Sequence, residues 1–446
     1  MKKYLTLLAG AMFLTACYND AEDIAGKDGY QPSTDAIAFE VNEDGVENSV
    51  TRASGMAYAT SVIEDNAYPG IGVFASYTGK LTYENTTVSP SFMWNQPLKY
   101  AGSAWGYNPV KYWPNGLAET PEYLSFFAYA PYEAAPAAEK CITDISDNDL
   151  TGDPWVNYRL GKYPWPKDET GATVTPDQVD LLYGTNDVNG DGSVYKPWTD
   201  VSKFNNDGSI NIGINDKVKF TMKHALASFA NEITIKLSDE LNGLILNYSD
   251  IIVYGIKIEY KNLTTKARLV LNSADGSANW KEVISGELTT TRTYYNVFAT
   301  DDELTALTFE GSSTTPAAKH IPYLNGGTDT DGAPKPLSTE GDGLFYIPLQ
   351  IAGQEKATAT VTLYYRVKIK AGGTYMPAIT DATNLIKDCA EATATFDLVK
   401  APTQIETMAG KKQGLALTLG KDYDLMHLVY TLGGTATEPS YSRLTK

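Results

Sequence analysis

The chain has 446 residues, with 36 basic and 54 acidic side chains and a formal net charge of −18. This length is sufficient for two or three domains with buried cores. An acidic surface repels phosphate backbones, which argues against a nucleic-acid-binding protein. Three cysteines are too few for a scaffold held together by disulfides, and three histidines leave little material for a histidine-rich metal site.

The first residues have the features of a secretory signal peptide. A positive start at Lys2 is followed by an apolar stretch, residues 4–14, which is too short to span a bilayer as a helix. The sequence Leu-Thr-Ala-Cys that ends at Cys17 resembles the lipobox of bacterial lipoproteins. This resemblance implies that residues 1–16 are removed and that Cys17 carries acyl chains, several of which anchor a protein stably. We favour this interpretation over an ordinary signal peptide that happens to contain a cysteine.

Most of the remaining sequence is typical of β-strands. Residues 17–35 are polar, acidic and without periodicity, and we expect them to form a flexible tether. Apolar residues then alternate with polar ones in many segments, separated by Gly, Asn, Asp and Pro clusters typical of turns. Only residues 381–392 favour a helix. The clearest alternating segments are Ile37/Phe39/Val41, Val218/Phe220/Met222 and Val361/Leu363/Tyr365.

These patterns predict an all-β fold whose strands bury one face and expose the other, as in antiparallel sandwiches. Residues 92–198 contain all but one of the 7 tryptophans, whereas the chain beyond about residue 214 is regular and rich in Val, Ile and Thr. We therefore predict two β-sandwich domains in tandem, residues 36–215 and residues 216–446, with a Greek-key or transthyretin-like arrangement.

Searches for catalytic chemistry find no metalloprotease, dithiol, nucleophile-elbow or nucleotide-loop motif. His224 continues a strand, so a structural role is favoured over that of a general base. The chain is therefore predicted to be neither an enzyme nor a cofactor-binding protein. A hydrolase with an unrecognised carboxylate pair is kept as a weaker hypothesis.

One short segment matches the opening of a calcium-binding loop. Asp187, Asn189 and Asp191 place oxygen ligands at alternate positions before a glycine. However, Trp198 stands where such a loop needs a bidentate glutamate, and no helical pattern flanks the segment. We favour a hairpin turn stabilised by Asx side chains, and keep calcium as a weak alternative.

Aromatic residues and cysteines leave two further questions open. Cys141 and Cys389 are predicted to be either two buried thiols or a disulfide between the domains, and sequence alone cannot place them within bonding distance. Many aromatic residues crowd residues 94–132, where they form either core or a surface that stacks on sugar rings, and we favour the core. They are Trp94, Tyr100, Trp105, Tyr107, Tyr112, Trp113, Tyr129 and Tyr132.

Several short motifs, in this order and spacing, resemble the fimbrillin family, the type V pilin-like lipoproteins. The resemblance covers most of the chain, but it is weaker in the C-terminal domain. The motifs follow the lipobox at Cys17. They are residues 37–39 (Ile-Ala-Phe) with 50–53 (Val-Thr-Arg-Ala), 71–75 (Ile-Gly-Val-Phe-Ala), 112–114 (Tyr-Trp-Pro) before 124–131 (Leu-Ser-Phe-Phe-Ala-Tyr-Ala-Pro), 180–184 (Asp-Leu-Leu-Tyr-Gly) and 218–227 (Val-Lys-Phe-Thr-Met-Lys-His-Ala-Leu-Ala).

The resemblance implies assembly by strand exchange. In fimbrillins an arginine-specific protease removes the N-terminal strand, and a strand from the C-terminal region of a neighbouring subunit fills the groove. Here this would mean cleavage between Arg52 and Ala53, although Arg52 could also be an ordinary strand-end residue. The removed strand would contain Ile37, Phe39 and Val41. The donor would be the imperfectly alternating segment with Leu425, Leu428, Tyr430 and Leu432.

Two main hypotheses follow. The first is a surface fimbrial subunit or fimbria-associated adhesin, anchored to the outer membrane through Cys17 and released into an extracellular fimbria after processing. Its partners would be other fimbrial subunits, and in addition surface ligands or glycans. The alternative is a surface glycan-binding lipoprotein of a polysaccharide-utilisation system, which would use the aromatic segment.

Overall fold

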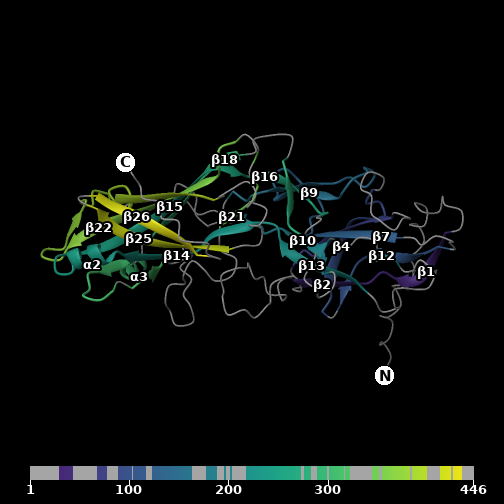
Figure 1. Ribbon diagram of the computed structural model, residues 1–446, viewed down its shortest axis with the longest axis horizontal. Coiled ribbons are helices and arrows are strands. Elements are labelled where there is room, and N and C mark those ends of the chain that lie inside the picture. Colours follow the sequence, from purple (N-terminus) through teal and green to yellow (C-terminus); the bar gives the residue numbers. More distant parts are fainter. Residues whose placement is uncertain are drawn as a thin grey trace, which may run out of the picture.

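The computed structural model describes residues 30–43, 68–77, 89–102, 104–116, 123–162, 177–187, 195–196, 201–202, 217–272, 276–282, 289–298, 301–315, 317–321, 344–349, 351, 354–381, 384–398, 412–422 and 425–433. Strands dominate this part of the chain, which is drawn out along one long axis (Figure 1). Its helices are α2 (Asp239–Ile245) and α3 (Asp301–Ala306). The all-β prediction is confirmed.

The first half of the chain is built on a nine-stranded sheet. Its main path runs β2–β13–β10–β7–β3–β4–β5, with β11 beside β10 and β12 beside β7. Every pairing in it is antiparallel except that of β2 with β13, which is parallel. The strands are β2 (Phe39–Glu43), β3 (Ile71–Tyr77), β4 (Met93–Tyr100), β5 (Trp105–Gly106), β7 (Tyr123–Ala130), β10 (Leu182–Asp187), β11 (Tyr195–Lys196), β12 (Val201–Ser202) and β13 (Val218–His224).

The first half of the chain also forms a separate two-stranded sheet. It pairs β1 (Tyr30–Ala36) with β6 (Tyr112–Gly116) in antiparallel fashion. Part of the segment expected to be a tether therefore forms a strand, because β6 supplies backbone partners that the polar composition of residues 30–35 does not reveal.

The second half contains a five-stranded and a six-stranded sheet. The first has the order β20–β14–β25–β26 with β21 beside β14, and the second has the order β18–β15–β22–β23 with β19 beside β15 and β24 beside β22. The strands are β14 (Ala227–Leu237), β15 (Ser249–Thr264), β18 (Thr289–Val297), β19 (Thr308–Glu310), β20 (Lys319–His320), β21 (Leu344–Tyr346), β22 (Thr358–Ile369), β23 (Thr374–Met376), β24 (Ala390–Asp397), β25 (Lys412–Asp422) and β26 (Leu425–Gly433).

A four-stranded sheet joins the two halves, in the order β17–β16–β9–β8. Strands β8 (Ile142–Ile145) and β9 (Trp155–Arg159) come from before residue 215, whereas β16 (Lys266–Val270) and β17 (Asn279–Lys281) come from after it. Strand β13 also lies past residue 215 and yet belongs to the first sheet. The proposed division at residue 215 stays a prediction, and two sheets combine strands from both sides of it.

Hydrogen bonds between side chains and backbone reinforce this junction. The indole of Trp280 donates to the Ala225 carbonyl (2.8 Å), and the Tyr183 hydroxyl donates to the Gly276 carbonyl (2.8 Å). The guanidinium of Arg268 lies 3.6 Å from the centre of the Trp155 ring, which is within range of a cation–π contact.

The central strand β7 is buried on both faces, so the core lies on both sides of the first sheet. Phe126 and Ala128 belong to one apolar cluster, together with β2 and β13. Phe127 and Tyr129 belong to the other cluster, which continues into the second half of the chain. Strand β7 therefore reads as a continuous apolar run in the sequence rather than as an alternating one.

Two expectations from the sequence are wrong. Residues 385–388 form a turn and β24 starts at Ala390, so the described part of the segment expected to be helical contains turn and strand but no helix. Strand β22 was expected to expose one face, but Thr362, Tyr364 and Arg366 are buried as well. On this face the guanidinium of Arg366 lies over the Tyr254 ring of the neighbouring strand β15, 4.8 Å from its centre.

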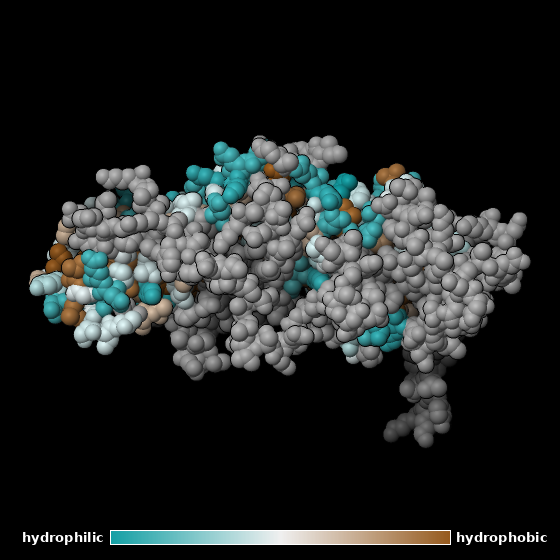
Figure 2. Space-filling view, viewed as in Figure 1, coloured by the Kyte–Doolittle hydropathy of each residue, from teal (hydrophilic) through white to brown (hydrophobic). Residues whose placement is uncertain are grey.

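Apolar side chains are exposed near the end of the molecule that carries α2 and β22, where Figure 2 shows hydrophobic atoms at the surface. Tyr248, just after α2, is 72% exposed and Met376 in β23 is 55% exposed. Single exposed apolar side chains are common on protein surfaces, and only contiguous apolar patches are unusual.

The junction sheet generates a stability prediction. Leu269 in β16 is fully buried and lies opposite Val156 of β9. We expect Leu269→Ala to lower the free energy of unfolding by about 2–5 kcal/mol, because it leaves a cavity between the halves. Urea unfolding measures this loss, with the exposed Lys281→Ala as a control that changes stability by less than about 0.5 kcal/mol. An equal, small effect of both variants would contradict the prediction.

Candidate functional site

The edge strand β2 completes the core on one side of the first sheet. Ile37, Phe39 and Val41 are only 2–3% exposed, so the predicted apolar face is buried. The Phe39 ring is stacked 6.0 Å from Phe220 and meets Phe126 edge-on at 5.9 Å. Period-two alternation places these three side chains on the same face of the strand.

Strand β2 is held by its parallel ladder with β13 and by further hydrogen bonds at its start. The Val218 amide of β13 donates to the Ala38 carbonyl (2.8 Å), and the Ile37 amide donates to the Lys111 carbonyl (2.9 Å). The hydroxyl of Tyr107 donates to the Ile37 carbonyl (2.9 Å), and its ring packs edge-on against Phe39 with 5.3 Å between the ring centres. Tyr107 therefore contacts both the backbone and a side chain of this segment. Burial raises the pKa of the Tyr107 hydroxyl, which keeps it protonated and able to donate.

Removing β2 would leave two unsatisfied surfaces. The β13 groups that face β2 would lose their backbone partners, and Phe220 and Phe126 would line an open apolar trough. An edge with unpaired backbone groups and an apolar floor is a template for the addition of another strand. The arrangement is therefore chemically suited to exchange of one β-strand for another.

The predicted donor segment lies in β26, at the edge of the five-stranded sheet. It pairs antiparallel with β25, placing Leu428 opposite Leu419 and Leu432 opposite Leu415. Its side-chain surroundings lie outside the described part of the structure. Within the described residues β26 has one strand neighbour in its sheet, so detaching it would break only one ladder.

Several predicted site residues cannot be located. Cys17, Arg52, Ala53, Asn189 and Asp191 lie outside the described residues. Asp187 ends strand β10, and its side chain is not described. Among the described residues, no group of three or more His, Cys, Asp or Glu side chains is arranged to hold a metal ion.

The histidine weighed as a general base has an acidic partner. His224 is buried, and its Nδ1 lies 2.5 Å from Oδ2 of Asp180, which is also buried. The Asp180 carboxylate also accepts a hydrogen bond from the Leu181 amide (2.8 Å). A buried pair held in this way fits the structural role that the sequence favoured.

The aromatic residues of the N-terminal half do not share one exposed face in the described structure. Tyr129 is fully buried, and its hydroxyl donates to Asn95 (2.8 Å). Trp94 is 45% exposed, but its indole donates to the Ser146 carbonyl (2.6 Å). Trp105 packs edge-on against Tyr100. The side chain of Trp113 lies outside the described set.

Cys141 and Cys389 are both free thiols in this structure. Cys141 donates to the Asp177 carbonyl and Cys389 to the Leu385 carbonyl, each over 3.2 Å. Burial raises the pKa of the Cys389 thiol to about 11. Of the two alternatives left open by the sequence, the structure has the pair of thiols.

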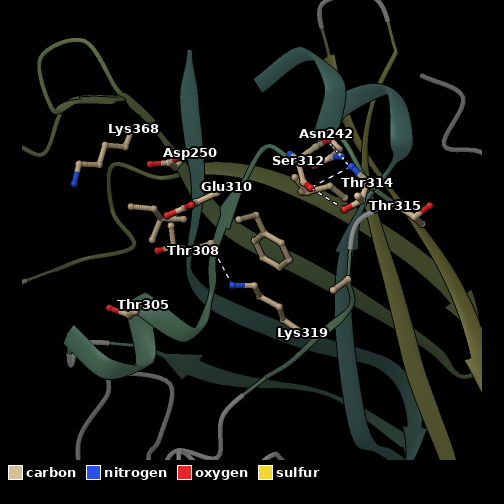
Figure 3. Close-up of a pocket in the computed structure, with 14 residues that line it drawn as sticks. Asn242, Asp250, Thr305, Thr308, Glu310, Ser312, Thr314, Thr315, Lys319 and Lys368 are labelled. Atoms are coloured by element: carbon tan, nitrogen blue, oxygen red, sulfur yellow. Dashed lines mark hydrogen bonds between the residues drawn. The ribbon is translucent and has the colours of Figure 1, made fainter. Parts of the chain in front are cut away.

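A cavity of about 560 Å³ opens at the far end of the second half, beside α2, α3 and β19. No motif in the sequence predicts this cavity, because its hydroxyl-rich segment 311–315 resembles an ordinary turn. Figure 3 shows Asp250, Glu310 and Thr308 grouped on one side and Asn242, Ser312 and Thr314 on the other. Lys319 reaches between them and donates to the Thr308 carbonyl (2.7 Å).

Tyr107 gives a direct test of how β2 is held. Tyr107→Phe removes the hydroxyl bond to Ile37 but leaves the ring contact with Phe39, so we expect a loss of about 0.5–1.5 kcal/mol. Local opening of β2 should rise accordingly, and hydrogen exchange of the amides in residues 37–43 measures it. Tyr100→Phe, on a ring with no contact to β2 in the described structure, is the matched control. Unchanged exchange of these amides in Tyr107→Phe would contradict a stabilising role for the hydrogen bond to Ile37.

Cys389 should react slowly with alkylating agents. A thiol with a pKa of about 11 has about 100-fold less thiolate at pH 8 than one at the ordinary value near 9, and the thiolate is the nucleophile. We expect the rate to rise with pH up to about 11, and to be fast in urea. Pulsed iodoacetamide labelling with mass spectrometry measures it. A peptide pair linked through Cys141 and Cys389 would contradict the free-thiol state.

Among the described residues, no helix has the length and apolar character needed to cross a bilayer.

Comparison with known proteins identifies relatives of one kind. No family model matches the chain. It is 31% identical over 110 residues to the fimbrium subunit Fim1C of Phocaeicola vulgatus, a segment that spans 24% of this chain and 27% of that protein. The chain therefore aligns with only about a quarter of this curated relative.

A solved structure extends the likeness to most of the chain. A fimbrial protein from Bacteroides vulgatus superposes with a TM-score of 0.53 over 90% of this chain and 100% of its own, at 18% identity. A candidate cell adhesion protein from Bacteroides ovatus covers 92% of this chain and 99% of its own, with a TM-score of 0.37 and 12% identity, a similarity too low to carry an argument. Local sequence similarity and shared fold together confirm the resemblance of this chain to the fimbrillin family.

Proposed function

We propose that the chain is a surface fimbrial subunit or fimbria-associated adhesin that joins other subunits by strand exchange. The observation that carries the proposal is β2, a parallel edge strand whose apolar residues complete the core of the first sheet. Residues 44–52 connect it to the candidate cleavage site after Arg52. Cleavage there would detach Ile37, Phe39 and Val41 from the rest of the chain while leaving β13 and β10 intact.

Lipid anchoring belongs to the same proposal. Cys17 precedes β2, so the lipid attached to Cys17 and the strand to be removed are on the same side of Arg52. One cut would release the subunit from the outer membrane and open its trough. A subunit that is still anchored by lipid would then be unable to assemble, because β2 still fills its trough.

Strand addition also has the right geometry for a polymer. The incoming strand would come from residues 425–433 of a second copy or of another fimbrial subunit. A strand donated from one end of a subunit to the opposite end of the next makes a head-to-tail contact, and repeated contacts of this type build a filament rather than a closed dimer.

We expect an arginine-specific protease to produce a new N-terminus at Ala53 and to convert monomers into a ladder of multimers on unheated gels. Arg52→Ala is the control that should stay uncut and monomeric. N-terminal sequencing and size-exclusion chromatography measure the two steps. A trimmed protein that stays monomeric at high concentration would refute the polymerising role.

The donor can be tested separately. Leu428→Glu places a charge in the segment that would enter the apolar trough, so we expect cleavage at the normal rate but multimers reduced at least ten-fold. A matched control is Leu244→Glu, which changes an exposed leucine of α2 (50% exposed) outside both strands. Loss of multimers in both variants would point to general damage and contradict a specific donor role.

A further inference from the structure

The cavity beside α2 and β19 has no part in the strand exchange proposed above. Its volume of about 560 Å³ lies within the range of about 300–1,000 Å³ typical of small-molecule sites. It is lined by residues from α2, β15, α3 and the 311–317 segment, all in the second half of the chain. Neither β2 nor β26 contributes to it.

One wall of the cavity is held rigidly. The Asn242 amide donates to the carbonyls of Ser312 (2.6 Å) and Thr314 (3.1 Å), and its oxygen accepts the Ser312 amide (3.0 Å). Asn242 is itself 5% exposed. Gly311 packs so closely on helix α2 that an added Cβ would come within 2.3 Å of Cα of Leu246. A wall fixed in this way is preorganised, which lowers the entropic cost of binding.

The cationic groups of the cavity are engaged by the protein. Nζ of Lys319 donates to the Thr308 carbonyl and lies 5.2 Å from the centre of the Phe309 ring. Burial lowers the pKa of this ammonium, although the nearby Glu310 opposes the effect. Nζ of Lys368 lies 5.6 Å from the centre of the Tyr375 ring, on the same strand pair.

Carboxylates, hydroxyls and apolar side chains complete the lining of the cavity. Asp250 lines the cavity, and its Oδ1, which is shielded from solvent, forms an ion pair with Nζ of Lys370 at 3.3 Å. Glu310 is exposed at the end of β19. Hydroxyl groups of Thr305 and Thr315 line the same cavity, and Leu237 and Ile252 give it apolar surface.

We propose that this cavity binds a neutral sugar unit. Carboxylates accept hydrogen bonds from sugar hydroxyls, threonine hydroxyls both donate and accept them, and apolar side chains contact the C–H faces of the ring. An anionic ligand would meet two carboxylates on a protein with a net charge of −18. A cationic ligand would meet Lys319 and Lys368. The balanced lining therefore selects a neutral, hydroxyl-rich group.

Saturation-transfer NMR on the intact, uncut protein tests this proposal. The probes are methyl α-mannoside, methyl β-galactoside, N-acetylglucosamine and fucose, with glucuronic acid as the charged comparator. We expect at least one neutral probe to bind with a Kd of about 1 mM, and glucuronic acid to bind at least ten-fold more weakly. Glu310→Gln should weaken the neutral probe at least ten-fold.

Controls separate this site from other effects. Glu391→Gln changes an exposed glutamate on β24, away from the cavity, and should leave binding unchanged. Thr315→Ala should weaken binding without altering thermal unfolding. The proposal is overturned if no neutral probe binds, if Glu310→Gln and Glu391→Gln bind equally, or if glucuronic acid binds best. Because the protein is monomeric and uncut in this assay, failure of strand exchange would not affect the result.

Discussion

The pairing of β2 with β13 is the interaction on which the proposed assembly depends. It is parallel, it lies at a sheet edge, and its apolar side chains fill a core that the other strands leave incomplete. A core closed by an edge strand can be opened without unfolding the sheet, because the remaining ladder from β13 to β5 keeps its own hydrogen bonds. Opening the core exposes an apolar trough to water, which is unfavourable, and leaves unpaired backbone groups along the new edge. Under the proposed function, the subunit would be stable while its strand is present and open to strand addition once the strand is removed.

The two proposals place assembly and sugar binding in different halves of the molecule. Strand β2 lies in the right half of Figure 1, whereas the cavity is beside α2 and α3 in the left half. The sheet of β9 and β16 joins these halves through backbone pairing and through the packing of Leu269 and Trp280. The described chain is therefore a continuous body, in which a sugar held at one end would be carried on the same rigid framework as the strand edge at the other.

The sequence was most informative where a strand buries one face. Ile37, Phe39 and Val41 alternate and are buried, and so are Val218, Phe220 and Met222, because period-two patterning follows directly from strand geometry. Strands covered on both faces, such as β22, carry no such signal. Alternation cannot report that Arg366 is covered, because a long polar stem packs on an aromatic ring as readily as it enters water.

Long-range pairing and the cavity could not have been predicted. β9 and β16 meet across more than a hundred residues of chain, with Asn157 and Arg268 in contact at a separation of 111, and no local pattern specifies which distant strand completes an edge. The cavity depends on Asn242 reaching residues 312–314, seventy positions away in sequence. Helix α2 had a local signal, since Ser238 caps it by accepting the Leu241 amide (3.2 Å), but it is only two turns long.

Hydrogen exchange of β13 tests the central claim most directly. The Val218 amide donates to β2, so by alternation the amides of Phe220 and Met222 also face β2, whereas those of Thr221 and Lys223 face β10. Residue-resolved exchange should show that cutting after Arg52 removes protection from the first set and spares the second. Assembly should then restore the first set. Protection of Val218, Phe220 and Met222 that survives cleavage in the monomer would contradict the account.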